Sequence, residues 1–171
     1  MTKAVFCIAK NTDQAESIVN ALITAGFSNN DISVLFPDKS TSKDFAHEKH
    51  TKAPEGAAIG GSVGLGTGAV LGLLAGIGAL AIPGVGPLIA AGPIMGALSG
   101  AAVGAATGGL AGALIGLGIP ECEANRYEGK ITGGNALISV HTESSEGVDK
   151  AKKIFEEAHA EDISSTGESS V

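Results

Sequence analysis

The sequence predicts an α+β protein in which two β–α–β units share one sheet and a hydrophobic helical hairpin is inserted between them. Three observations lead to this prediction. Strand, helix and strand patterns follow one another at both ends of the chain. Between these ends, the 65 residues from Gly56 to Pro120 contain no Asp, Glu, Lys, Arg or His. Within that uncharged run, glycine recurs at every fourth position over long stretches.

The first half of the chain reads as one β–α–β unit. Residues 3–10 form a short apolar stretch bounded by lysines, which suits a strand buried on both faces. Asn11 is a candidate N-cap with Gln14 three residues later, and Gly26 ends the helical spacing that follows. Alternating residues over 31–36 predict the second strand.

The second half repeats the pattern after an additional helix. We expect a short helix over 121–132, a third strand over 135–142, and a helix capped by Ser144 or Ser145. A weaker fourth strand is expected over 161–166. Two β–α–β units of this kind that share a sheet give a split, ferredoxin-like βαβ–βαβ sandwich.

The domain organisation follows from these patterns. Residues 1–55 comprise the first β–α–β half and a polar linker, and residues 120–171 comprise the short helix and the second half. We expect these two segments to form one domain. Residues 56–119 are expected to form the inserted hairpin.

The glycine spacing predicts two helices that pack backbone to backbone, because residues four apart share a helix face and glycine leaves that face without side chains. We expect the helical arms over 56–81 and 93–118. The candidate helix-packing and oligomerisation residues are Gly56, Gly60, Gly64, Gly68, Gly72 and Gly76, then Gly92, Gly96, Gly100, Gly104, Gly108, Gly112 and Gly116. The candidate hairpin turn is Pro83, Gly84, Gly86 and Pro87.

Such a hairpin needs partners. Glycine costs about 1 kcal/mol relative to alanine inside a helix. The run contains 20 of the 26 glycines. We therefore expect this cost to be offset either by insertion of the hairpin into lipid or by its packing against many other copies of the hairpin. Each arm would be about 39 Å long, enough to span a bilayer core of about 30 Å with some tilt.

Charge and cysteine content narrow the possible environments. The formal net charge is −7, which argues against a nucleic-acid partner. The apolar stretch at the N-terminus is too short for a signal peptide, and two cysteines, Cys7 and Cys122, are too few for a disulfide scaffold. We expect the protein to lie at the cytoplasmic membrane with both termini in the cytoplasm, or alternatively to form an assembly in the cytoplasm. Basic residues flank the run at Lys49, Lys52, Arg126 and Lys130.

No constellation of catalytic residues stands out. His47 and His50 are three residues apart, which is not the spacing of a helical zinc site. His141 and His159 read as surface or strand-end histidines, and Cys7 as a core residue. We therefore expect no enzymatic activity, no cofactor and no metal.

The chain resembles bacterial general-stress proteins of the heat-induced stress protein family, whose small α/β domain carries a glycine-zipper insertion. The resemblance rests on the sequence from Lys3 to Asp38, on 119–141 and on 160–168. It implies an association with stress and brings no catalytic residues with it.

Two main functional hypotheses remain open. In the first, the protein is a non-enzymatic, stress-associated homo-oligomer whose glycine-zipper hairpin lies in or on the cytoplasmic membrane and contacts lipid. In the second, the protein is a structural one whose hairpins pack against other copies without lipid, in a shell, layer or filament. A third possibility, an enzyme or small-ligand sensor, rests only on the versatility of the fold.

Overall fold

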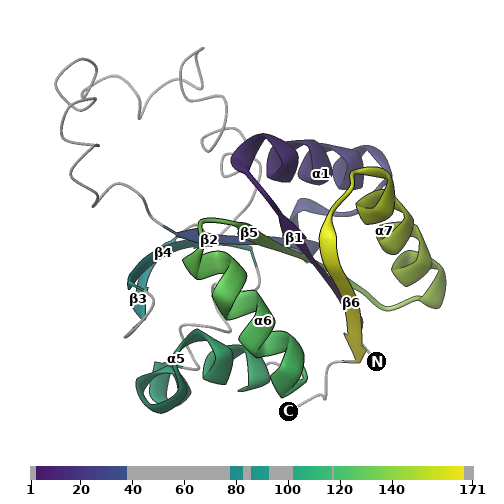
Figure 1. The fold of residues 1–171 in the computed structure, drawn as a ribbon. Helices are drawn as coiled ribbons and strands as arrows, with labels where there is room; N and C mark the ends of the chain where they lie inside the picture. Colours follow the sequence, from purple (N-terminus) through teal and green to yellow (C-terminus); the bar gives the residue numbers. More distant parts are fainter. Residues whose placement is uncertain (1–2, 38–77, 83–85, 93–101, 117, 168–171) are drawn as a thin grey trace, which may run out of the picture.

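The computed structural model describes residues 3–37, 78–82, 86–92, 102–116 and 118–167 (Figure 1). Its strands are β1 (Lys3–Ala9), β2 (Ile32–Pro37), β3 (Gly78–Ile82), β4 (Gly86–Ala91), β5 (Ala136–Thr142) and β6 (Glu161–Gly167). Its helices are α1 (Thr12–Thr24), α5 (Ala102–Gly116), α6 (Glu121–Thr132) and α7 (Ser145–Glu157), with a short 3-10 helix at Asn29–Asp31. The predicted α+β class is confirmed.

The strands form one antiparallel sheet in the order β3-β4-β2-β5-β1-β6. Strand β5 lies between β1 and β2, and β1 lies between β5 and β6. Each terminal β–α–β unit therefore has a strand of the other unit between its own two strands. Helices α1 and α7 cover one face of the sheet, and α5 and α6 cover the other (Figure 1).

Strand β1 shows why both faces of the sheet must pack against helices. Ala4, Phe6 and Ile8 belong to the core beneath α5 and α6. The alternate residues Val5, Cys7 and Ala9 belong to the core beneath α1 and α7. Successive side chains of a strand point to opposite faces, so an apolar strand without alternation requires two apolar layers. The prediction of a strand buried on both faces is confirmed.

The signals that begin and end α1 act as expected. The side chain of Asn11 accepts a hydrogen bond from the backbone N–H of Gln14 at 2.8 Å. Gln14 Oε1 accepts in turn from the backbone N–H of Lys10, one residue before the cap. At the other end, Gly26 has φ +98° and closes the helix with hydrogen bonds from its own N–H and from that of Phe27.

The second half of the chain also follows the sequence closely. Helix α6 occupies the predicted residues. The Ser144 side chain caps α7 by accepting from the backbone N–H of Gly147, which places the start of the helix at Ser145. Strands β5 and β6 match the predicted third and fourth strands to within one residue at each end.

The prediction of a helical arm that continues to residue 81 is wrong. Residues 78–82 form β3, which pairs with β4, and β4 pairs with β2. In this arrangement β4 has a paired strand on each side, and its residues Leu88 and Ala90 are fully buried. Strand pairing therefore determines the structure of 78–82, which follow the last glycine of the first series, Gly76. The rest of the first arm, 56–77, lies outside the described residues.

The second glycine series differs from the predicted helix-packing face in two places. Gly92 follows β4 with φ +86° and is not helical. Residues 102–116 are helical, but Gly109 has φ 63° and ψ −155°, so α5 consists of two helical pieces joined at a break. Gly104 and Gly108 lie before the break, and Gly112 and Gly116 lie after it. Among the described residues, these four glycines do not form one straight face.

Part of the uncharged run belongs to the core of the sheet. Leu88, Leu110 and Leu114 are fully buried in the same cluster as Phe6 and Leu137. Helix α5 packs against α6 and also contacts β3. None of the helices in the described parts of the chain is both long enough and apolar enough to cross a membrane.

Gly92 and Gly26 offer a matched test of this packing. Both have positive φ, but a Cβ atom on Gly92 would lie only 2.1 Å from the backbone oxygen of Ile32, whereas one on Gly26 would meet nothing within 4 Å. We expect Gly26→Ala to lower the free energy of unfolding by about 1 kcal/mol. Gly92→Ala should lower it by about 3 kcal/mol or more, because β2 or β4 must shift. Urea unfolding measures both, and equal losses would show that β4 does not approach β2 as described.

Candidate functional site

The predicted helix-packing glycines divide between described and undescribed residues. In α5, Gly104, Gly108, Gly112 and Gly116 keep their four-residue spacing across the break. Two of the predicted turn residues, Gly86 and Pro87, begin β4. The other candidates lie outside the described residues, and these are Gly56, Gly60, Gly64, Gly68, Gly72, Gly76, Pro83, Gly84, Gly96 and Gly100.

The break in α5 is held by α6. The carboxylate of Glu128 accepts a hydrogen bond from the backbone N–H of Ala111, two residues after Gly109. The first N–H groups of a helical piece have no partner within it, so Glu128 satisfies one of these groups from a neighbouring helix. The sequence placed Glu128 inside a helix but could not identify this contact across 17 residues of chain.

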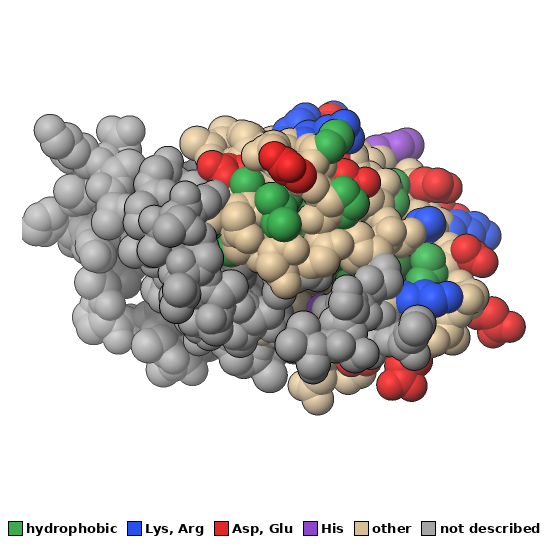
Figure 2. Space-filling model, turned by 90° about the horizontal axis from the view of Figure 1, so that it is seen from below, with side chains coloured by type: hydrophobic (Ala, Val, Ile, Leu, Met, Phe, Trp, Pro, Cys, Tyr) green, Lys and Arg blue, Asp and Glu red, His purple; other side chains and the backbone are tan. Residues whose placement is uncertain are grey.

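The end of α5 is apolar and exposed. Ile115 is 43% exposed. A Cβ atom added to Gly116 would meet nothing within 4 Å, so no described group packs there. Figure 2 views the molecule from below, and hydrophobic side chains are visible there between acidic groups of the described surface. The uncharged run thus contributes surface as well as core.

One edge of the sheet also comes from the uncharged run. Strand β3 pairs with β4 on one side, and the strand order gives it no neighbour on the other side among the described residues. Its five residues, Gly78–Ile82, include no charged residue and no proline. Unpaired backbone groups of an edge strand are a template for another strand. This edge is the strongest candidate for a contact surface that the described residues present.

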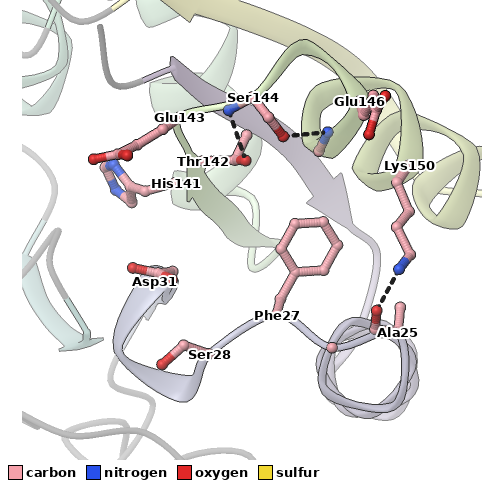
Figure 3. Close-up of a pocket in the computed structure, with 12 residues that line it drawn as sticks. Ala25, Phe27, Ser28, Asp31, His141, Thr142, Glu143, Ser144, Glu146 and Lys150 are labelled. Atoms are coloured by element: carbon pink, nitrogen blue, oxygen red, sulfur yellow. Dashed lines mark hydrogen bonds between the residues drawn. The ribbon is translucent and has the colours of Figure 1, made fainter.

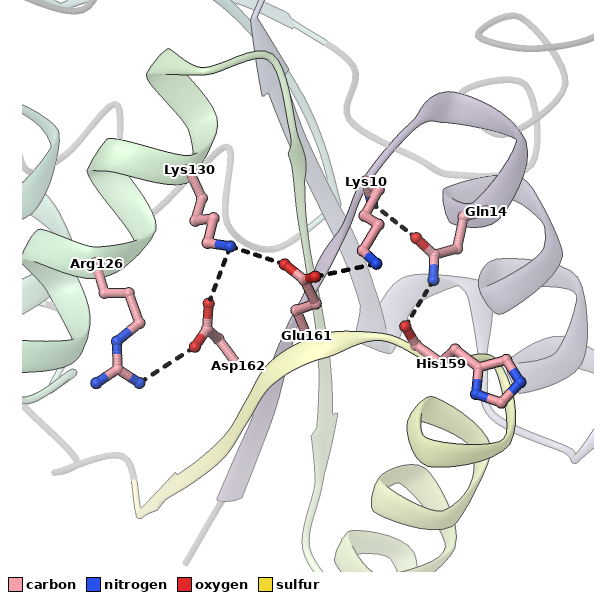
Figure 4. Close-up of polar contacts among 7 residues, drawn as sticks. All are labelled: Lys10, Gln14, Arg126, Lys130, His159, Glu161 and Asp162. Carbon is pink, nitrogen blue, oxygen red and sulfur yellow. Dashed lines mark hydrogen bonds and ion pairs between the residues drawn. The ribbon is translucent and has the colours of Figure 1, made fainter.

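The opposite edge, β6, is built differently. Asp162 and Ile163 lie opposite the single residue Cys7, which makes a β-bulge. Asp162 adopts φ 48° at this bulge. Bulges disrupt the ladder and re-aim side chains, and here the carboxylates of Glu161 and Asp162 meet basic residues of neighbouring elements (Figure 4).

The ion pairs at the bulge join three segments. Glu161 contacts Lys130 of α6 at 2.8 Å and Lys10, which follows β1, at 3.1 Å. Arg126 of α6 contacts Asp162 at 3.2 Å. The hydrogen bonds from Lys130 and then from Lys10 lower the pKa of Glu161 below its ordinary value, and the hydrogen bond to Glu161 raises the pKa of Lys130. These contacts fasten β6 to α6 and to the end of β1.

Tyr127 anchors the same strand from the interior. Its hydroxyl donates to the backbone oxygen of Asp162 at 2.8 Å and is hydrogen-bonded to the Ser164 hydroxyl at 2.7 Å. Its ring packs against Phe6, with centroids 6.3 Å apart. Burial raises the pKa of Tyr127 to about 12. A phenol in this state remains protonated at neutral pH and has a structural role here.

A cleft of about 810 Å³ opens between the end of α1 and the start of α7 (Figure 3). Its lining includes Phe27, the end of β5 and the first turn of α7. Lys150 reaches across it, donates to the backbone oxygen of Ala25, and lies 6.0 Å from the centroid of the Phe27 ring. Lys150 therefore joins the two helices across the cleft.

The cleft is acidic and lacks a recognisable catalytic arrangement. Asp31, Glu143 and Glu146 line it together with His141, which the sequence placed at the end of a strand. No group of three or more His, Cys, Asp or Glu side chains suited to a metal ion occurs among the described residues. The sequence did not identify this cleft, because its lining comes from two segments more than a hundred residues apart.

The cysteines and the other histidines considered in the sequence lie at separate places in the described parts of the chain or outside them. Cys7 is fully buried, and burial raises the pKa of its thiol, so it is a core residue as expected. Cys122 is exposed. His159 ends α7 with φ 57°, and its backbone oxygen accepts from the Gln14 side chain. His47 and His50 lie outside the described residues.

Comparisons with protein-family models, with curated proteins and with solved structures found no match for this chain.

The Glu161 cluster predicts a specific pH dependence. The folded protein holds the pKa of Glu161 below its ordinary value of 4.5. The stabilisation is therefore complete above that value and is lost as the pH falls through the folded pKa. We expect Glu161→Gln to lower the free energy of unfolding at pH 7 and to flatten its decline on acidification, as measured by urea unfolding between pH 7 and pH 3.

Glu157→Gln is the control for this variant. Glu157 is 67% exposed and contacts Lys153 at 3.9 Å within α7, and exposed pairs of this kind contribute little. A Glu157→Gln variant with the same loss of acid dependence would contradict the role assigned to Glu161.

Proposed function

We propose that this protein is a non-enzymatic, self-associating protein, and that the uncharged run from Gly56 to Pro120 supplies the contacts between copies. Its sequence resemblance supports an association with stress. The observation that carries the proposal is the origin of the β3 edge: an uncharged strand without proline forms one border of the sheet. Soluble proteins usually protect such edges with charges, prolines or bulges.

The chemistry of the described residues supports a structural role. The strongest polar cluster, at Glu161 and Asp162, consists of ion pairs that hold β6 in place. The one buried thiol, among the described residues, lies in the core beneath α1 and α7. These groups of the described residues take part in contacts between elements of the fold.

We also propose that the terminal units form a ferredoxin-like split β–α–β fold. The order β2-β5-β1-β6, with α1 and α7 together on one face, supports this assignment. The segment between β2 and α6 would then be an insertion that adds two strands to one edge and a helical layer to the other face. Together with α6, helix α5 explains why β1 is apolar on both faces and why Leu137 of β5 is buried on the second face.

A membrane site for the assembly is the second candidate. It is favoured by the length of the uncharged run and by basic residues on both of its flanks. Two of these, Arg126 and Lys130, also pair with acidic residues of β6, which gives them a structural function that is independent of lipid. Lys49 and Lys52 lie outside the described residues.

The test substitutes four glycines of the run at once. In the full-length protein, Gly64, Gly68, Gly100 and Gly104 are changed to leucine, and in a control the same four are changed to alanine. We expect the wild type and the alanine variant to sediment as oligomers and the leucine variant to shift to a smaller species, because small residues permit close backbone approach and leucine does not.

Two results would contradict the proposal. A wild-type protein that sediments as a monomer would exclude self-association, and a leucine variant of wild-type size would exclude the glycine contacts. Fractionation without detergent separates the two locations. Protein that stays with membranes after carbonate and high-salt washing favours the lipid-associated form, and large soluble particles favour the assembly without lipid.

A further inference from the structure

We infer that β3 pairs in antiparallel fashion with β3 of a second copy, across a twofold axis at Leu80, so that two six-stranded sheets become one continuous sheet. The inference rests on the self-association proposed above and names the surface and register by which two copies join. It differs from the glycine contacts, since its hydrogen bonds come from the backbone of an edge strand.

The first argument is the chemistry of the edge. A strand at the border of a sheet presents alternate backbone N–H and C=O groups that its inner neighbour does not use. Along Gly78–Ile82 these groups are accompanied only by glycine and aliphatic residues. Nothing in the strand's sequence disfavours the approach of another strand through charge, and every residue in it retains its backbone N–H.

The second argument is the contrast with β6. That edge carries two carboxylates, Glu161 and Asp162, and a bulge at which Asp162 and Ile163 lie opposite Cys7. Charges and bulges are two of the devices by which edge strands avoid pairing. Among the described residues, the sheet thus has one edge with charges and a bulge and one edge with neither. This asymmetry allows a pair of sheets to form and leaves both outer borders of that pair protected.

The third argument identifies the occupant as a second copy. When two copies of β3 run antiparallel about Leu80, Ala79 lies opposite Ala81 and Gly78 lies opposite Ile82. Alanine then faces alanine, glycine faces isoleucine, and no like charges meet. A twofold contact requires such a self-complementary patch, and this strand is nearly palindromic about its central residue.

Helix α5 extends the contact beyond the strand. It packs next to β3, and all of its residues, Ala102–Gly116, are uncharged. Two copies joined at β3 would therefore bring a second uncharged layer close to the seam on the α5 face. A strand alone buries little area, and an adjoining apolar layer supplies more.

The direct test places charges at the two facing positions. In the full-length protein, the double variant Ala79→Lys with Ala81→Lys sets lysine opposite lysine twice in the proposed register. The matched control, Ala79→Lys with Ala81→Glu, sets lysine opposite glutamate twice at the same positions. Sedimentation velocity over a range of concentrations measures the dissociation of each.

We expect the lysine–lysine variant to have a dissociation constant about tenfold or more above that of the lysine–glutamate variant, so that it dissociates at higher protein concentrations. Overall charge works in the other direction, because two added lysines reduce the net charge of −7 and weaken general repulsion between copies. Equal dissociation constants would overturn the β3 contact.

A cysteine pair tests the register itself. Both variants carry Cys122→Ser, which removes the exposed natural thiol. Leu80→Cys places the new thiols opposite each other across the twofold axis, within reach of a disulfide. Ile82→Cys places each thiol opposite Gly78 of the other copy and about 13 Å along the strand from its equivalent.

Mild copper-catalysed oxidation followed by non-reducing electrophoresis should give a covalent dimer with Leu80→Cys and at least about tenfold less with Ile82→Cys. Oligomers that persist without cross-linking at residue 80, or that cross-link equally at both positions, would overturn the register while leaving self-association intact. A protein that stays monomeric in sedimentation would overturn both this inference and the proposed function.

Discussion

The burial of β1 and β5 on both faces is the constraint on which the rest of the structure depends. Residues Ala4 to Ala9 are all buried, and they alternate between the two cores. Helices α1 and α7 cover only one of these faces. The uncharged run provides much of the second cover through Leu88, Leu110 and Leu114, so it is needed for the fold as well as for the contacts that we propose.

Because the uncharged run contributes both to the core and to an edge of the sheet, the two edges, β6 and β3, differ in charge. At β6, Lys10, Arg126 and Lys130 neutralise the carboxylates and Tyr127 holds the bulge from the interior. Those contacts fix the strand and keep its border polar. Strand β3 belongs to the uncharged run, so this edge carries no charged side chain. Among the described residues, this segment therefore both fills a core and forms the edge that we propose as a contact between copies.

The sequence predicted the elements whose signals are local. The Asn11 cap, the Gly26 stop and the Ser144 cap each depend on residues within a few positions of one another, and the structure has all three. The α+β class followed from the same signals. The first helical arm was expected to continue to residue 81, but residues 78–82 pair with β4, and β4 pairs with β2. A contact of β4 with β2 across some fifty residues leaves no local signal.

The candidate surfaces were harder to predict for the same reason. The bulge at Asp162 arises from the register of β6 on β1. The cleft is lined by the end of α1 and the start of α7, which meet only in the folded chain. The edge at β3 could be recognised only once the strand order was known. The glycine series itself is visible in the sequence, and the break at Gly109 shows why periodicity alone does not define a straight helix.

Backbone amide hydrogen exchange on the full-length protein at several concentrations tests the central claim most directly. The amides of Gly78–Ile82 should become more protected as the concentration rises, because their outward groups gain partners in a second copy. Those of β1 and β5, already paired on both sides, should keep the same protection throughout. Protection at 78–82 that does not change with concentration would contradict the proposed contact between copies at β3.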